Sequence, residues 1–393
     1  MAPHRLMTLP AHFPFFLASF TWNYGLGMTW LAVPLYAHAL GLSGSQIGVL
    51  FSAPVILQVT ITMVGGAYAD RFGGRLVMLL SSLLVACGAA LYLAASGFWM
   101  LFAGQLVMVI ARATFWPANW AIAAELPGDR GVQAGRLNAV SNLGQILGNA
   151  TCGFVLATAG FAASFTVMGA LGLAAWAAGL GTPRPGHRGG ASRGLFENYR
   201  TLIRMRVLQY GVLCAYLSAL PFSLSLSFYP LLLQFLGFTE EASGILIALR
   251  AVGGIGAGLV IARFVRSGPA SLWPVASGVL TAIGVGFQPL FTHWMPVGVL
   301  LLAVGIASGI MTVYFQVTLG DLVEPAMRGS AMALGGLGWG LSHFSTPLIM
   351  GLMTDRYGIV AGFYALGAVS LAVAVMIALL RPWAFARSAL AGA

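Results

Sequence analysis

The sequence has very little charge and no lysine at all. Only 7% of its 393 residues are charged, whereas 59% are hydrophobic, and all 19 basic residues are arginine. About 25% of the residues of a typical soluble domain are charged, so this composition predicts an integral membrane protein. The formal net charge of +10 does not indicate nucleic-acid binding, because most arginines lie in short segments between apolar runs, where membrane topology requires them.

Cysteines and the motifs of common enzymes are also scarce. Cys87, Cys152 and Cys214 all fall within apolar runs, without the spacing of a metal site or of a disulfide framework. The glycine clusters at 253–258 and 335–340 match neither G-x-G-x-x-G nor a phosphate-binding loop, which disfavours an ATP-driven pump. No motif of a membrane protease or transferase is present, so we predict a protein that is not an enzyme and that uses no metal or other cofactor.

Long apolar runs are abundant. Each is long enough to cross a bilayer as a helix, which pairs its backbone polar groups within the lipid. The first run follows Arg5 without a clear cleavage site, so we interpret it as a span and not as a removed signal peptide. The prediction is an all-α membrane protein with twelve transmembrane helices, at 12–40, 46–69, 76–95, 98–124, 136–159, 162–181, 207–236, 241–262, 271–292, 295–320, 330–353 and 359–380.

The arginines are divided unevenly between the two sides of these spans. With the N-terminus inside, sixteen of them fall in inner segments and only Arg356 falls in an outer loop. Basic residues collect on the cytoplasmic side of membrane proteins. Both termini are therefore expected in the cytoplasm, and we expect the membrane to be the inner (plasma) membrane of a bacterium.

Segment 182–206 divides the chain into two halves. It begins with Thr-Pro-Arg-Pro-Gly-His-Arg-Gly-Gly, which is typical of a linker, and continues as a short amphipathic helix expected on the inner leaflet. A helix that binds a receptor is the alternative. The two halves repeat, because 130–165 aligns with 328–363 without a gap. We expect bundles at 1–181 and 207–393, joined by the linker.

The loop between the second and third spans carries the most specific motif. Gly66, Asp70, Arg71, Gly73 and Arg75 match G-x-x-x-D-R/K-x-G-R/K-R/K, with Gly74 where a basic residue is usual. This loop, its flanking spans and the internal repeat resemble the major facilitator superfamily of secondary transporters, and the resemblance covers essentially the whole chain. It implies two pseudo-symmetric bundles of six helices that move a solute by alternating access.

The resemblance assigns Asp70, Arg71 and Arg75 to a gate on the inner side. It implies that Asp70 lies near the start of the eleventh span, at Gly329-Ser330, where the partial positive charge of a helix N-terminus attracts a carboxylate. That contact is expected to keep the inner side closed while the cavity faces outward. A helix cap or a topology signal is the alternative interpretation of Asp70.

The same resemblance implies a cavity between the halves, lined mainly by the first, fourth, seventh and tenth spans. The residues predicted to bind substrate are polar or aromatic groups of these spans and one arginine of the eighth: Asn23, Tyr24, Arg112, Trp116, Asn119, Tyr216, Tyr314, Gln316 and Arg250. Arg112, Trp116 and Asn119 are spaced i, i+4, i+7, so they share one helix face. Packing between helices is the alternative for such residues.

Arg112 and Arg250 lie near the centres of their spans, where the sequence places no acid. An arginine there costs about 2.5–3.5 kcal/mol on insertion scales, so something must compensate it. A water-filled cavity that binds an anionic substrate is one compensation. For Arg250 another is an amide oxygen of Asn142, Gln145 or Asn149. For Arg112 the resemblance offers a role of a fourth-span arginine in gating or proton movement.

All nine acidic residues map to loops or span ends, so none is placed as a proton site at mid-membrane. His343, central in the eleventh span, is the predicted site for a coupling proton because imidazole titrates near neutral pH. Glu125, at the inner end of the fourth span, is a second candidate. A neutral His343 bonded to a neighbouring helix is the alternative.

The fifth span contains a partial match to a signature of drug:proton exporters, g-x-x-x-G-P-x-x-G-G. Gly144, Gly148 and Gly153 fit it, whereas Asn149 and Cys152 replace the proline and one glycine. Close helix packing explains the glycines equally well.

We therefore predict a secondary transporter of a small amphipathic or anionic organic solute, with export as the favoured direction and protons as the candidate coupling ion. The alternatives are an importer or facilitator of an organic anion or sugar, a lipid flippase, and a transporter-like receptor that moves nothing.

Overall fold

The computed structural model describes residues 12–182, 201–260, 264–265, 268, 271–324 and 327–386, and within these ranges all regular secondary structure is helical. The helices are α1 (Phe13–Ala39), α2 (Gly44–Phe72), α3 (Gly74–Leu93), α4 (Phe98–Glu125), α5 (Arg130–Gly179), α7 (Arg206–Leu226), α8 (Tyr229–Phe235), α9 (Glu240–Val260), α10 (Trp273–Gly286), α11 (Trp294–Leu322), α12 (Arg328–Gly335), α13 (Leu337–Tyr357) and α14 (Ile359–Phe385), with a 3₁₀ turn η2 (Gln288–Leu290) after α10. Eight of the described segments are long and apolar enough to cross a membrane.

The helices follow the predicted spans, with three differences in how the spans are built. The fifth and sixth spans run together as α5, which is interrupted at Gly160, where φ is 76°. Only glycine adopts this conformation at little cost, so the turn depends on it. The seventh span continues from α7 into α8, and the eleventh from α12 into α13. The predicted fold class, all-α with two bundles of six spans, is confirmed.

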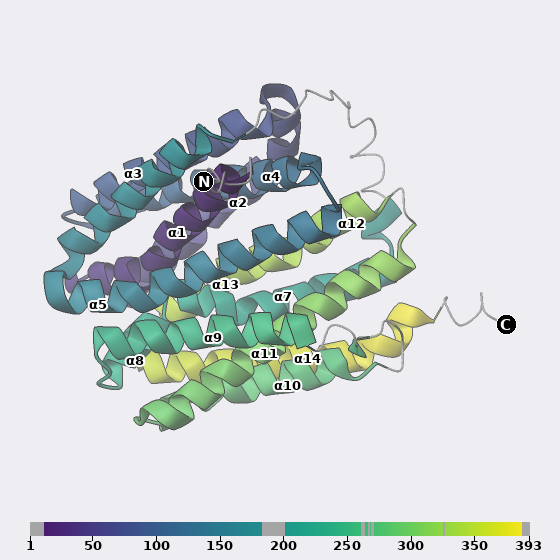
Figure 1. The fold of residues 1–393 in the computed structure, drawn as a ribbon. Helices are drawn as coiled ribbons and strands as arrows, with labels where there is room; N and C mark the ends of the chain where they lie inside the picture. Colours follow the sequence, from purple (N-terminus) through teal and green to yellow (C-terminus); the bar gives the residue numbers. More distant parts are fainter. Residues whose placement is uncertain are drawn as a thin grey trace, which may run out of the picture.

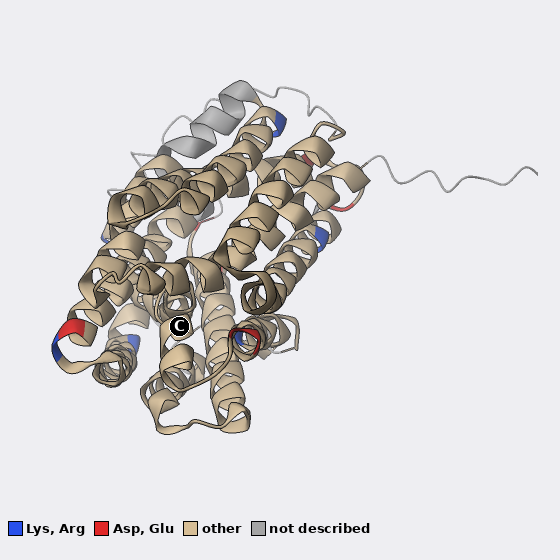
Figure 2. Ribbon diagram, turned by 90° about the vertical axis from the view of Figure 1, so that its left-hand side faces the viewer, with Lys and Arg blue, Asp and Glu red and all other residues tan. Residues whose placement is uncertain are grey.

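The two halves of the chain form two adjacent groups of helices (Figure 1). Helices α1, α3, α4 and α5 pack on one another, as do α7, α10, α11 and α14. Figure 2 shows how little of the ribbon carries charge, as a membrane interior requires. The predicted linker at 182–206 lies mostly outside the described residues. Of its final part, Leu202 is buried in the core of the second half and Ile203 is exposed.

Glycines set the spacing between α1 and α5. The Gly148 Cα faces the Tyr24 carbonyl oxygen of α1, and a Cβ on Gly144 would lie 2.5 Å from the Phe20 carbonyl oxygen. Gly153, the third glycine of the partial exporter signature, faces the backbone of Glu240 on α9. All three positions therefore serve close helix packing, which small residues permit in membranes.

The two halves meet at one end of the bundle. We call it the arginine-poor end; it carries the turns at 40–43, 94–97, 236–239 and 358. There a Cβ on Gly48 of α2 would lie 2.6 Å from the Pro347 carbonyl oxygen of α13, and one on Gly244 of α9 would lie 2.6 Å from the Asn149 carbonyl oxygen of α5. Backbones this close leave no room for a path between the halves at that end.

The opposite, arginine-rich end carries the turns at 73, 126–129 and 323–327. Among the described residues, α4 packs substantially only on helices of the first half and α11 only on helices of the second. One apolar core contains residues of both halves, whereas a second core belongs to the second half alone. Among the described residues, the close backbone contacts between the halves therefore gather toward the arginine-poor end.

Candidate substrate site

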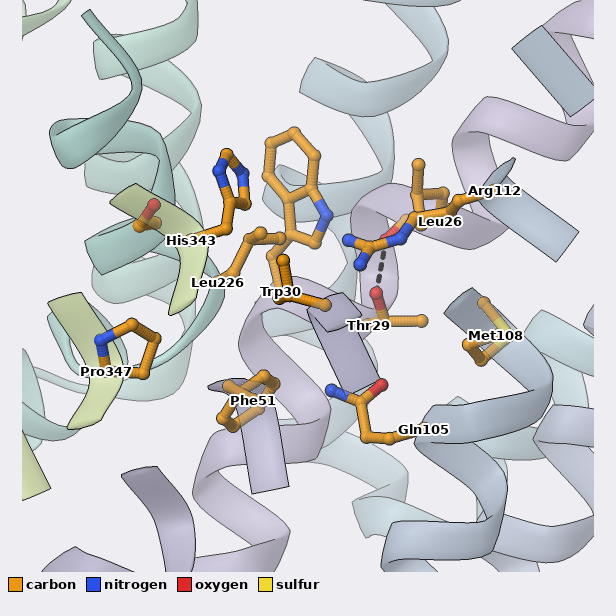
Figure 3. Close-up of a pocket in the computed structure, with 12 residues that line it drawn as sticks. Leu26, Thr29, Trp30, Phe51, Gln105, Met108, Arg112, Leu226, His343 and Pro347 are labelled. Carbon is orange, nitrogen blue, oxygen red and sulfur yellow. Dashed lines mark hydrogen bonds between the residues drawn. The ribbon is translucent and has the colours of Figure 1, made fainter. Parts of the chain in front are cut away.

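A cavity lies between the halves and is lined by both of them (Figure 3). The space between its side chains, including the part open to solvent, is about 460 Å³. Helices α1, α2, α4, α7 and α13 supply the lining residues, which are Leu26, Thr29, Trp30, Phe51, Val55, Gln105, Met108, Arg112, Ser223, Leu226, His343 and Pro347. The tenth span, α11, contributes none of them, whereas α2 and α13 do, in contrast to the lining that the resemblance implies.

Arg112 provides the charge of this cavity. Its guanidinium points from α4 toward Trp30 and Thr29 (Figure 3). One terminal nitrogen donates a hydrogen bond to Gln58 Oε1 at 2.9 Å, while Nε is buried and has no acceptor. A hydrogen bond to a charged group contributes about 1.5–3 kcal/mol, which at best balances the insertion cost of about 2.5–3.5 kcal/mol. Of the five donor hydrogens of a guanidinium, most therefore remain for a ligand.

The other polar groups around Arg112 are also donors. The Trp30 Nε1 is buried without an acceptor. The Gln105 Oε1 already accepts a 2.5 Å bond from Tyr92 Oη, which leaves its amide nitrogen for a ligand. The Thr29 hydroxyl donates to the Leu26 carbonyl oxygen at 2.6 Å, the dashed line in Figure 3. Because the described residues that line the cavity include Arg112 and no carboxylate, the cavity is cationic.

His343 lies on the opposite wall, on α13. Its Nδ1 is 2.8 Å from the Trp339 carbonyl oxygen, one turn earlier in the same helix. A carbonyl oxygen only accepts, so Nδ1 carries the proton and Nε2 has the lone pair. The ring stacks on Trp339 at 5.9 Å between centroids and lies 5.4 Å from that of Phe222. His343 can therefore take up a proton at Nε2 beside the cavity.

Most other predicted binding residues of the first half lie outside this cavity. Asn23 is buried between α1 and α5, where its Nδ2 donates to Ser19 O and its Oδ1 accepts from Gln145 Nε2, both at 2.8 Å. The Tyr24 hydroxyl is 2.7 Å from Thr151 Oγ1. Asn119 is fully buried with neither side-chain polar atom bonded. Trp116 packs edge-on against the neighbouring ring of Phe115. Of the predicted trio on α4, only Arg112 lines the cavity.

The predicted binding residues of the second half are likewise dispersed. The Tyr216 hydroxyl lies 3.1 Å from Ser345 Oγ, joining α7 to α13. Tyr314 is fully buried against Tyr210, and Gln316 is exposed on α11. Arg250 is 5% exposed, and its guanidinium lies 5.5 Å from the Phe222 ring centroid. A cation–π contact contributes about 0.5–2 kcal/mol, less than the insertion cost of an arginine at mid-membrane.

The residues predicted to act in gating, and Glu125 as the second candidate for proton coupling, belong to the arginine-rich end. Asp70 and Arg71 lie outside the residues whose side chains the structure describes. Arg75 donates a hydrogen bond to the Leu180 carbonyl oxygen just after α5, within the first half. Glu125 is exposed at the last residue of α4. Their roles stay predictions.

Three contributors to the site were not found from the sequence. Trp30 and Phe222 sit in apolar runs, where an aromatic residue carries no signal of a cavity. Gln58 is a polar residue in the second span, and that alone could have marked it as a partner for an intramembrane charge.

The sequence profile of the Major Facilitator Superfamily matches residues 15–292 and 212–387, which together span nearly the whole chain. The chain belongs to the Major Facilitator Superfamily. The resemblance indicated by the loop motif and the internal repeat is thereby confirmed. The protein is an integral membrane transporter of this superfamily.

Two curated members of the superfamily match part of the chain. The quinolone resistance protein NorA of Staphylococcus aureus is 27% identical over 154 residues, which are 39% of this chain and 39% of that protein. A probable sulfoacetate transporter, SauU of Cupriavidus necator, is 29% identical over 145 residues, 36% of this chain and 34% of that protein. The chain thus matches well under half the length of these relatives.

The likeness in structure extends much further. The crystal structure of the nucleoside transporter NupG covers 95% of this chain and 99% of its own, with a TM-score of 0.75 at 18% sequence identity. At this identity the likeness shows the shared fold alone.

Proposed function

We propose that this superfamily transporter carries a small organic anion, and that Arg112 binds the anionic group. One observation supports the proposal above all: the Arg112 guanidinium has unused donors in a cavity that no carboxylate lines. A planar guanidinium binds a carboxylate, sulfonate or phosphate through two parallel hydrogen bonds. The partial match to a probable sulfoacetate transporter is consistent with this class of solute.

The rest of the cavity suits the organic part of such an anion. Trp30, Phe51, Met108 and Leu226 provide apolar surface to the cavity. Burial of apolar surface contributes about 25 cal/mol per Å², so a ligand with an aliphatic or aromatic body binds more tightly than an inorganic anion.

We propose that alternating access takes place between the bundles 1–181 and 207–393. In the present conformation the backbones of the halves touch at the arginine-poor end, and α4 and α11 stay apart toward the other end. With the arginine-rich end in the cytoplasm, as basic residues require, this is a conformation that faces the cytoplasm. The arginine-poor end then faces outward.

We propose His343 as the group that couples a proton to substrate movement. Its Nε2 has a free lone pair beside the cavity that contains Arg112. Protonation there adds a second positive charge and a further donor for an anion, so a proton and an anion bind together more readily than either alone.

For the direction of transport, the support comes from sequence similarity. The partial match to NorA and the incomplete exporter signature favour export. The alternative is uptake, which anion–proton symport through His343 favours, because a proton gradient directed inward would draw the anion in. Measuring flux in proteoliposomes with a pH gradient of either sign distinguishes the two directions.

Binding experiments test the proposed substrate class. Purified protein is screened by thermal shift against organic carboxylates, sulfonates and phosphates of matched size, with quaternary ammonium compounds and neutral sugars alongside. We expect stabilisation by anions only. Arg112→Lys, which keeps the charge but not the planar fork, should weaken binding about 10-fold, and Arg112→Gln should weaken it further.

Arg206 provides the matched control, since it is an arginine of α7 at the arginine-rich end, over the Trp383 ring and away from the cavity. Arg206→Gln should leave binding unchanged. Stabilisation by cations, or equal anion binding by wild type and Arg112→Gln, would contradict the proposal.

A further inference from the structure

A second guanidinium is buried in the middle of the bundle without a partner. Arg250, on α9, is 5% exposed, and its Nε is buried with no acceptor. Within the part of the chain that the structure describes, no hydrogen bond or ion pair compensates its charge. The expected amide partner on α5 is not used, because the buried Asn149 Oδ1 has no hydrogen-bond donor. A buried guanidinium without a hydrogen-bond acceptor or countercharge is suited to bind the anionic group of a ligand.

A second polar group near Arg250 also makes no hydrogen bond. Tyr229, the first residue of α8, is fully buried, and its hydroxyl makes no hydrogen bond. It lies close enough to Arg250 for the two groups to interact electrostatically. A guanidinium and a phenolic O–H are both hydrogen-bond donors that an anionic group can accept from.

Only one side chain separates this pair from the cavity. The Arg250 guanidinium faces the Phe222 ring at 5.5 Å. The Phe222 ring also contacts the rings of Trp30 and His343, both of which line the cavity. The distances between ring centroids are 4.8 Å to Trp30, with the rings edge to face, and 5.4 Å to His343. Ser223, the next residue of α7, lines it as well. Phe222 is therefore the wall between the cavity and Arg250, and rotation of its side chain connects them.

We propose that Arg250 and Tyr229 form a second anion subsite for the same substrate, opened by movement of the Phe222 ring. This inference rests on the proposed function, in which Arg112 binds one anionic group. The substrate is then a short organic dianion, such as a dicarboxylate or a sulfocarboxylate, with one acidic group at Arg112 and the other at Arg250. No acid lines the cavity to repel either group.

Paired ligands test the two subsites separately. Binding is measured by titration of Trp30 fluorescence, in a variant in which the other tryptophans are phenylalanine, with malonate, succinate, glutarate and 3-sulfopropionate. Each is compared with the monoanion of equal length that lacks one acidic group, such as butyrate for succinate. Wild type should bind the best dianion at least 10-fold more tightly than its monoanion.

Arg250→Gln should remove this preference and leave monoanion affinity unchanged, because the monoanion uses Arg112 alone. Arg250→Lys should restore part of the preference, and Tyr229→Phe should reduce it about 3-fold. Phe222→Ala should keep the preference, which a merely structural role of the ring would not predict. The thermal stability of each ligand-free variant is measured first, so that a folding defect is recognised.

The outcomes separate this inference from the proposed function. If wild type binds dianions and monoanions equally, or if Arg250→Gln weakens both equally, the second subsite is refuted while anion binding at Arg112 stands. If Arg112→Gln leaves monoanion binding unchanged, the proposed function itself is wrong.

Discussion

The arginine-poor end contains a hydrogen-bonded contact between the two halves whose removal should change the balance of conformations. The Asp355 carboxylate, at the end of α13, accepts bonds from the backbone N–H groups of Gly44 at 2.6 Å and Ser45 at 2.8 Å. Gly44 is the first residue of α2, so the carboxylate also faces the positive end of that helix. Asp355 belongs to the second half of the chain, and both of its carboxylate oxygens accept hydrogen bonds from the first half.

The size of the effect follows from these contacts. A charge at a helix N-terminus contributes about 0.3–1 kcal/mol at an exposed site, and a hydrogen bond to a charged group adds about 1.5–3 kcal/mol when sheltered. Because Asp355 is exposed, solvent screening reduces this sum, and we use about 1–2 kcal/mol, which is roughly a 5- to 30-fold change in an equilibrium constant. Asp355→Asn should therefore populate the conformation open at the arginine-poor end roughly 5- to 30-fold more.

Labelling of a cavity cysteine measures this shift. Cys87, Cys152 and Cys214 are replaced by serine or alanine, and Phe51, which lines the cavity, becomes the only cysteine. A membrane-impermeant thiol reagent is then added on the arginine-poor side. The labelling rate should rise in Asp355→Asn and stay at the background rate in Glu240→Gln, a control at an acid of the same end. Equal rates in Asp355→Asn and its parent would refute the role of the contact.

The same contact predicts a dependence on pH. Burial is the largest single effect and raises the pKa of Asp355, but the hydrogen bonds from Ser45, Gly44 and Ser43 together outweigh it and lower the pKa below its usual range. A carboxylate with a lowered pKa contributes fully above its ordinary pKa and loses that contribution as the pH falls through the lowered value. The labelling rate should thus be constant from neutral pH down to the usual carboxylate range and rise only in stronger acid. A rise near neutral pH would point to another group.

Three further predictions concern the proton site, the packing and the linker. His343→Gln should remove the pH dependence of anion binding, measured by titration at several pH values; persistence of the wild-type profile would exclude His343 as the coupling group. Gly148→Ala should lower the free energy of unfolding by about 1–3 kcal/mol, because the added Cβ would clash with the Tyr24 carbonyl oxygen. Gly256→Ala is the control: a Cβ there has nothing within 4 Å, so the change should be neutral or stabilising. The melting temperatures of the two variants in detergent are compared. Limited proteolysis of inside-out vesicles should cut first within 182–206, and earlier cutting at the arginine-poor end would overturn both the topology and the boundary.

The fold was predictable from the sequence because the membrane leaves few alternatives. Runs of apolar residues of membrane length must be helices, and the loop motif at Gly66–Arg75 together with the internal repeat identified the superfamily. The breaks were less visible. Gly160 is one of 52 glycines, and only the backbone shows that it turns the chain.

The site was predictable only in its charged members. Arg112 and His343 are costly inside a membrane, so their presence alone indicated function, and both line the cavity. Asn23 and Asn119 carry the same polar signal but lie within the first half, because a span that is apolar on all sides does not reveal how it is rotated. The contact between Asp355 and Gly44 joins residues 311 positions apart, and no local pattern predicts such a pair.

Counterflow of an organic anion in proteoliposomes tests the central proposal most directly. Liposomes loaded with the best unlabelled anion from the binding screen are diluted into the labelled anion, and uptake is followed for wild type, Arg112→Gln and Gln58→Glu. Gln58→Glu places a carboxylate at the group that now accepts a 2.9 Å bond from Arg112, so the guanidinium would be paired internally. The proposal predicts rapid exchange by wild type and loss of exchange in both variants. Exchange at the wild-type rate in both variants, or the absence of exchange in wild type despite anion binding, would contradict it.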